Sequence, residues 1–182
     1  MAKINRQLNL VIPIEQGEST IYAHATPVSS ETFDSYFLTI AKAFSAIYSE
    51  GLGIIAGPRV AHNVLRKVSE ELGNWDEIKR GLINEIHRLT NVFAPQDKGW
   101  QMIPYDDAVR TGVIDAEDVG EIESALVFFT LSWHMHKRNA REEILQGASA
   151  LWGAQITSLS CTEYRDSLPT LTAGENTGEN QG

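Results

Sequence analysis

The chain has 182 residues, of which 42% are hydrophobic and 21% charged, as is ordinary for one globular domain. Its formal net charge of −9 disfavours nucleic acid and anionic membrane surfaces as partners. The single cysteine, Cys161, excludes an intrachain disulfide, and no apolar run approaches the ~20 residues that a membrane-spanning helix needs. The composition therefore predicts a cytoplasmic protein.

The N-terminal residues predict a β-hairpin over 8–25. Residues 8–14 are rich in β-formers, Gly17 suits a turn, and residues 19–25 alternate apolar and polar side chains. Pro13 lacks a backbone N–H and therefore favours an edge position for the first strand. Because an isolated hairpin is marginal in water, this one must pack on helices or join a partner's sheet.

Most of the remaining chain has the apolar spacing of helices, with residues recurring at intervals of three and four. The first helix, 31–49, follows Ser29 and Ser30, which are suitable N-caps. Between the helices, residues 91–107 contain Pro95, Gly99 and Pro104 and are predicted to be irregular. Further helices are expected at 58–72, 74–89, 105–110, 116–140, 141–152 and 160–167.

These elements predict a mainly α fold, in which about five to six helices accompany the N-terminal hairpin. Residues 1–171 are expected to form this single helical domain. Residues 172–182 repeat Gly-Glu-Asn and lack apolar periodicity, so we expect a disordered C-terminal tail there.

The segment 132–138, Ser-Trp-His-Met-His-Lys-Arg, contains the residues most typical of a chemical site. On a helix, His134 and His136 lie about 200° apart and cannot share one metal ion. We interpret them as packed histidines near the end of helix 116–140, with the following bases stabilising its C-terminal dipole. A metal or catalytic role for this pair, or for Cys161, is the alternative, although no nucleophile, base and orienting group occur at interpretable spacings.

Helix 116–140 is apolar on nearly all sides, which is typical of a helix at the centre of a core. The alternative is that part of its surface forms a partner groove, since aromatic residues and methionine are enriched at interfaces. Beyond it, we expect a partner-binding segment that contains Trp152, Tyr164, Leu168 and Leu171.

Several phrases of the sequence resemble a known family when they are taken in order over about residues 20–170. They are IYAHATPVSSETFDSYFLTIAKAFSAIYSEGLG, AGPRVA, EIHRLTNVFAP, GWQMIPYDDA, ESALVFFTLSWHMHKR and LWGAQITSLSCTEYRDSLPT. In texture and order they resemble the tail assembly chaperones of long-tailed bacteriophages, which are encoded beside the tape-measure protein. The resemblance rests on no catalytic motif.

The resemblance implies a mainly helical, non-catalytic protein of the host cytoplasm that is absent from the mature virion. Such a protein binds and solubilises the tape-measure protein and helps to recruit tail-tube subunits, and self-association is left open. No catalytic residue, cofactor or metal ligand carries over from the family. The alternatives are a structural minor tail or connector protein of the virion and, more remotely, a small enzyme that uses His134, His136 or Cys161.

Overall fold

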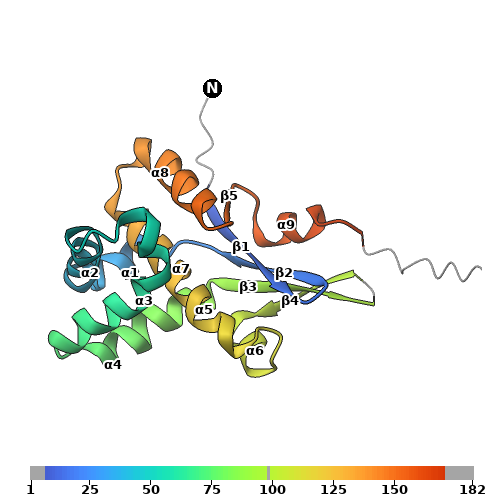
Figure 1. Cartoon of the computed structure of the whole chain (residues 1–182), viewed down its shortest axis with the longest axis horizontal. Coiled ribbons are helices and arrows are strands. Elements are labelled where there is room, and N and C mark those ends of the chain that lie inside the picture. The colour runs from blue at the N-terminus through green and yellow to red at the C-terminus, as the bar shows by residue number, and fades with distance from the viewer. Residues whose placement is uncertain (1–6, 98, 171–182) are drawn as a thin grey trace, which may run out of the picture.

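The computed structural model describes residues 7–97 and 99–170, which form a mixed α/β fold (Figure 1). An antiparallel sheet of five strands has the order β4-β3-β2-β1-β5. The prediction of a mainly helical domain with only an N-terminal hairpin is therefore wrong, because three further strands join that hairpin. The strands are β1 (Asn9–Gln16), β2 (Ser19–Ala25), β3 (Thr90–Gln96), β4 (Gly99–Pro104) and β5 (Gln155–Thr157).

The predicted hairpin forms between β1 and β2, with Gly17 at the turn in a left-handed conformation (φ 60°). On its other side β1 pairs with the short strand β5 over only three residues, Asn9 to Val11. Pro13 lies beyond that pairing, where β1 has a neighbour on one side only. The edge position predicted for the first strand is therefore found only in the part of β1 that contains Pro13, and over Asn9 to Val11 the strand is internal to the sheet.

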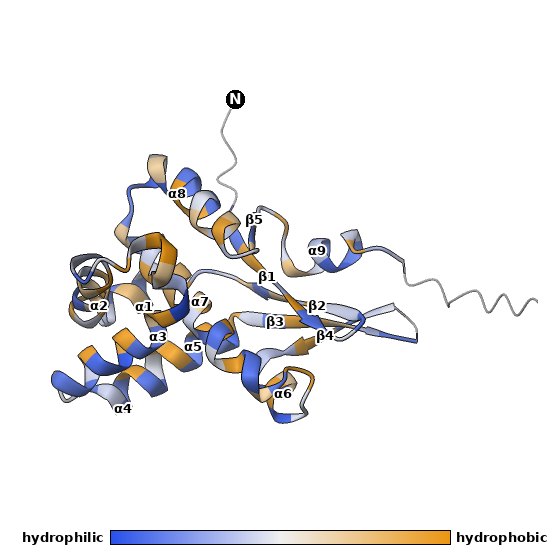
Figure 2. Ribbon diagram, in the orientation of Figure 1, coloured by the Kyte–Doolittle hydropathy of each residue, from blue (hydrophilic) through white to orange (hydrophobic). Residues whose placement is uncertain are grey.

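The helices group at one end of the sheet, except α6, α8 and α9, which flank the strands (Figure 1). In Figure 2, α3 and α8 each carry both hydrophobic and hydrophilic residues, as expected of helices with one face on a core. None of the helices in the described part of the chain is both long and apolar enough to cross a membrane. The helices are α1 (Ser30–Ser35), α2 (Phe37–Ser49), α3 (Gly53–Glu71), α4 (Trp75–Ile78), the π-helical turn η1 (Lys79–Ile83), α5 (Asn84–Arg88), α6 (Tyr105–Arg110), α7 (Ala116–Met135), α8 (Arg138–Leu151) and α9 (Cys161–Ser167).

Two predicted helices are interrupted. Helix 31–49 breaks at Tyr36 (φ −115°, ψ 13°), which separates α1 from α2. Helix 116–140 ends at Met135, because His136 and Lys137 have extended backbone conformations. Arg138 therefore begins α8 instead of closing the dipole of α7.

The stretch predicted to be irregular, 91–107, contains β3, β4 and the start of α6. Gly99 has a φ of 116° at the start of β4, just after the turn that joins the two strands. Val92 and Phe93 are both buried, although adjacent side chains point to opposite faces of the sheet. Burial on both faces removes the alternation by which a strand is recognised in sequence.

The centre of the main core is α7, whose residues from Ser124 to Ser132 are all buried. Gly57 on α3 allows the closest approach to it. A Cβ atom at Gly57 would lie 2.6 Å from Cε2 of Phe128 and 3.0 Å from Cγ2 of Ile47. The absence of a side chain at this one position thus sets how closely α2, α3 and α7 pack.

We expect Gly57→Ala to lower the free energy of unfolding by about 1–3 kcal/mol, because the new methyl group overpacks a filled core. Gly147→Ala on α8 is the matched control, since a Cβ there meets nothing within 4 Å. It should raise stability by about 0.5–1 kcal/mol through helix propensity. Urea denaturation measures both variants, and a stabilised Gly57→Ala protein would contradict the packing argument.

Candidate functional site

The surface of α2 and of the two ends of α3 carries large apolar side chains that the core does not cover. Phe37 and Leu38 on α2 are 52% and 61% exposed, and Tyr48 at the other end of α2 is 38% exposed. Ile55 at the start of α3 is 81% exposed. We call the six exposed residues of these two helices the apolar surface: Phe37, Leu38, Tyr48, Ile54, Ile55 and Leu72.

The helix α2, which carries part of the apolar surface, is anchored in the core by its opposite side. Ile40, Ala43 and Ile47 of α2 are fully buried in the main core. At one end, Leu38 and Leu72 line an open pocket of about 220 Å³ between the start of α2 and the connection from α3 to α4, together with Glu77. The exposed side chains therefore lie on a rigid support with a shallow depression beside them.

Sequence reasoning did not single out this surface, although it identified the helix. The apolar residues predicted for 31–49 were Phe33, Tyr36, Phe37, Ile40, Phe44, Ile47 and Tyr48. At about 100° per residue they span an arc of roughly 120°, which is ordinary for a single buried face of a helix. The pattern therefore gave no signal that part of this face is exposed, and Leu38 does not belong to it.

The histidines of segment 132–138 have separate packing partners. His134 stacks on Phe33, with ring centroids 4.4 Å apart, and its Nε2 lies 3.0 Å from the carbonyl oxygen of Val28. The ring of His136 meets the ring of Phe44 edge-on at 5.5 Å. Burial lowers the pKa of both imidazoles. The two rings have different partners, as expected, although His136 lies beyond the end of α7 and so lacks the helical spacing on which that expectation rested.

The predicted partner-binding residues pack within the protein where they are described. Tyr164 is buried on the outer face of the sheet, and Leu168 packs beside it. Trp152 is half-buried against the main core. Leu171 lies outside the described residues, as does the predicted tail 172–182. The three described side chains therefore stabilise the position of the C-terminal segment.

The C-terminal segment crosses the sheet on the face opposite α6 (Figure 1). The ring of Tyr164 lies 6.1 Å from the ring of Tyr22 and 5.7 Å from that of His24. The carbonyl oxygen of Leu159 accepts a hydrogen bond from Asn9 Nδ2 at 2.9 Å. Together these contacts hold the segment on β1 and β2.

Cys161 also lies on this face, far from segment 132–138. Its Sγ is 3.4 Å from the Sδ of Met102 on β4. Burial raises the pKa of the Cys161 thiol, which disfavours the nucleophilic thiolate. The structure therefore does not bring Cys161 together with His134 or His136.

A network of four titratable side chains joins four helices. One oxygen of Glu123 on α7 lies 3.4 Å from Nδ1 of His62 on α3, and the other lies 3.4 Å from Nε2 of His87 on α5. The second ring nitrogen of His87 is 2.9 Å from Oδ1 of Asp106 on α6. The ring of Tyr105 packs on His87 with centroids 4.7 Å apart. The network holds together helices that are distant in sequence.

Burial and neighbouring charges shift the pKa values in this network in opposite directions. Burial lowers the pKa of His62, and this effect outweighs the attraction of Glu123. Burial alone would raise the pKa of Glu123, but the hydrogen bond from His87 and the charges of the imidazoles and of Lys79 lower it. Among the residues that the structure describes, no group of three or more histidine, cysteine or acidic side chains is arranged to hold a metal ion.

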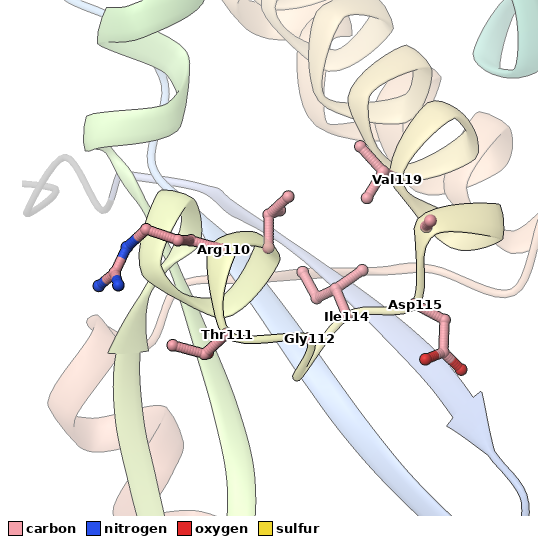
Figure 3. Close-up of a pocket in the computed structure, with 8 residues that line it drawn as sticks. Arg110, Thr111, Gly112, Ile114, Asp115 and Val119 are labelled. Carbon is pink, nitrogen blue, oxygen red and sulfur yellow. The ribbon is translucent and has the colours of Figure 1, made fainter.

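A larger open pocket, of about 600 Å³, lies between α6 and the start of α7 (Figure 3). The side chains of Arg110 and Asp115 point away from each other in Figure 3. Arg110 instead donates a hydrogen bond of 2.7 Å to Asp107. The pocket therefore does not bring its two charged side chains together for acid–base chemistry.

We expect the free energy of unfolding to fall as the pH is lowered from about 7.5 to about 5.5. Burial lowers the pKa values of His24, His62, His134 and His136, so below about pH 6.5 the unfolded chain binds protons that the folded state resists. Urea denaturation at each pH measures this slope. In His62→Gln the slope should be shallower, because glutamine does not titrate, and a protein that gains stability on acidification would contradict the prediction.

No match was found when the chain was compared with models of protein families, with curated proteins and with solved structures. The exposed apolar surface and the histidine–carboxylate network are thus the main features on which a function can be proposed.

Proposed function

We propose that this protein is a tail assembly chaperone of a long-tailed bacteriophage. It binds the apolar, helical tape-measure protein in the host cytoplasm and keeps that protein soluble until the tail is assembled. The observation that carries the proposal is the apolar surface of α2 and α3, where Phe37, Leu38 and Ile55 are each more than half exposed. The family resemblance over residues 20–170 supplies the identity of the client.

Exposed apolar side chains at both ends of one pair of helices are typical of a surface that binds another protein. When a partner covers these side chains, binding is favoured by about 25 cal/mol for each Å² of apolar area removed from water. A chaperone needs such a surface on a scaffold that does not unfold to provide it. The buried side of α2, with Ile40, Ala43 and Ile47, supplies that scaffold.

The charge of the chain is compatible with this activity. A protein that exposes apolar residues risks association with its own copies, and a net charge of −9 opposes this by mutual repulsion. The client contact that we propose is of the helix-in-groove kind, in which an apolar face of one helix lies between helices of another protein. We propose further that the protein helps to recruit tail-tube subunits and is absent from the mature virion.

We expect co-expression to make the tape-measure protein encoded beside this gene soluble and to allow the two to be purified together. Phe37→Ser/Ile55→Ser should lose most of this effect, because both side chains lie on the apolar surface and outside the core. Leu151→Ser is the matched control, since Leu151 is 62% exposed at the end of α8 and does not belong to that surface. A pull-down and a solubility assay measure all three proteins.

Two results would contradict the proposal. One is a tape-measure protein that stays insoluble and unbound in the presence of the wild-type chain. The other is the presence of this protein at stoichiometric amounts in purified mature virions, which would assign it to the minor tail or connector proteins.

A further inference from the structure

One side of α2 carries an apolar stripe that ends in two exposed aromatic rings. Phe37, Ala41, Phe44 and Tyr48 recur at spacings of four, three and four, so they lie on one side of the helix. Phe37 and Tyr48 are exposed, whereas Ala41 and Phe44 are half-buried. At a rise of about 1.5 Å per residue, the stripe is about 16 Å long, or three turns of a partner helix.

The middle of the stripe adjoins the connection between α7 and α8. The ring of His136 lies 5.5 Å from the ring of Phe44, and Arg141 Nη2 is 3.4 Å from the carbonyl oxygen of His136. Lys137 and Arg138 follow His136 directly and are exposed. A basic rim, formed by Lys137, Arg138 and Arg141, therefore borders the α2 stripe.

The bases of the rim form no ion pair with a described acidic side chain, as is also true of Lys42, Lys67, Lys79 and Arg80. Five arginines elsewhere do pair with a carboxylate: Arg59, Arg66, Arg88, Arg110 and Arg165. The rim differs from the other bases that form no ion pair in that Lys137, Arg138 and Arg141 fall within five residues, which concentrates positive charge at the start of α8, just before Glu142 and Glu143.

The position of the rim adds to the electrostatic repulsion among its positive charges. Lys137 and Arg138 stand at the beginning of α8, where the helix dipole is already positive. Arg141 places its guanidinium over the ring of Trp133, 4.4 Å from the ring centroid, which fixes its direction. A carboxylate from a partner would offset both the like charges and the dipole.

We propose that the client segment bound along α2 is an amphipathic helix with an apolar face about three turns long and carboxylates on the flank that meets the basic rim. This deepens the chaperone function proposed above and rests on it. The apolar residues of the client cover Phe37 and Tyr48 and pack over the small side chain of Ala41. Its Asp or Glu residues meet Lys137 and Arg138, which sets the direction in which the client lies.

Two synthetic helical peptides of about 18 residues test this chemistry. Both carry leucines at spacings of four, three and four, and they differ only in having glutamates or lysines on one flank of that face. Fluorescence anisotropy with the full chain should give a dissociation constant at least about tenfold lower for the glutamate peptide, with this advantage shrinking as salt is added. Equal affinities for the two peptides would overturn the inference.

Two variants separate the charged contribution from the apolar one. Lys137→Glu/Arg138→Glu should abolish the preference for the glutamate peptide, whereas Phe37→Ser/Tyr48→Ser should weaken binding of both peptides about tenfold or more. Lys67→Glu/Arg80→Glu is the control, because it changes the net charge equally at exposed positions away from the rim. An equal loss of preference in this control would show that the rim has no special role, and the inference would fall.

The oligomeric state supplies a further test. If light scattering finds a dimer that Phe37→Ser/Tyr48→Ser dissociates, a second copy of the chain covers the α2 stripe, and the inference is overturned. A monomer, or a dimer that this variant leaves intact, supports it.

The inference and the proposed function can fail separately. If the peptides bind as expected but the tape-measure protein stays insoluble, the client chemistry stands and the chaperone identity fails. If the tape-measure protein is solubilised equally by the wild-type chain and by Phe37→Ser/Tyr48→Ser, the chaperone identity stands and the α2 stripe is not its site.

Discussion

The fold depends on the burial of α7. Its residues from Ser124 to Ser132 are enclosed on all sides, which requires a sheet on one side and α2 and α3 on the other. Contact this close is possible because Gly57 lets α3 approach Phe128. Burial of this stretch on every side removes more apolar area from water than the single face of an amphipathic helix does. The other elements are arranged so that residues 124–132 of α7 have no side left for solvent, whereas Glu117, Gly120 and Glu121 near its start are exposed.

Local patterns predicted the local elements. The hairpin of β1 and β2 follows from Gly17 and the residues on either side of it, and Ser29 caps α1 as expected, accepting a hydrogen bond from the backbone of Thr32. The strands β3 and β4 could not be predicted in this way, because β3 pairs with β2 across more than sixty intervening residues. Pro95, Gly99 and Pro104 have the composition of a loop, although in the structure they lie in the hairpin of β3 and β4, where Pro95 pairs with Trp100 and Gly99 with Gln96.

The candidate sites differ in how far they could be predicted. The separation of His134 from His136 was predicted from helical geometry, but the structure separates them in another way, because α7 ends at Met135 and His136 is extended. The network of His62, His87 and Glu123 could not be found, since its members come from three helices whose relative positions depend on the tertiary fold. The side of α2 that stays exposed likewise depends on where α3 and α7 lie. The spacing of apolar residues in the sequence gives the width of the apolar face of a helix. Which part of that face stays exposed to water depends on how the helix packs in the fold.

The C-terminal segment has a consequence for the order of events during synthesis. The strand β5 completes the edge of the sheet beside β1, although about 140 residues separate the two, and Tyr164 covers the outer face of the same strands. The N-terminal hairpin therefore leaves the ribosome long before its neighbour exists, with Val11 and Tyr22 uncovered in the meantime. Contacts between distant parts of a chain form slowly, so the N-terminal strands are the first to be made and among the last to be enclosed.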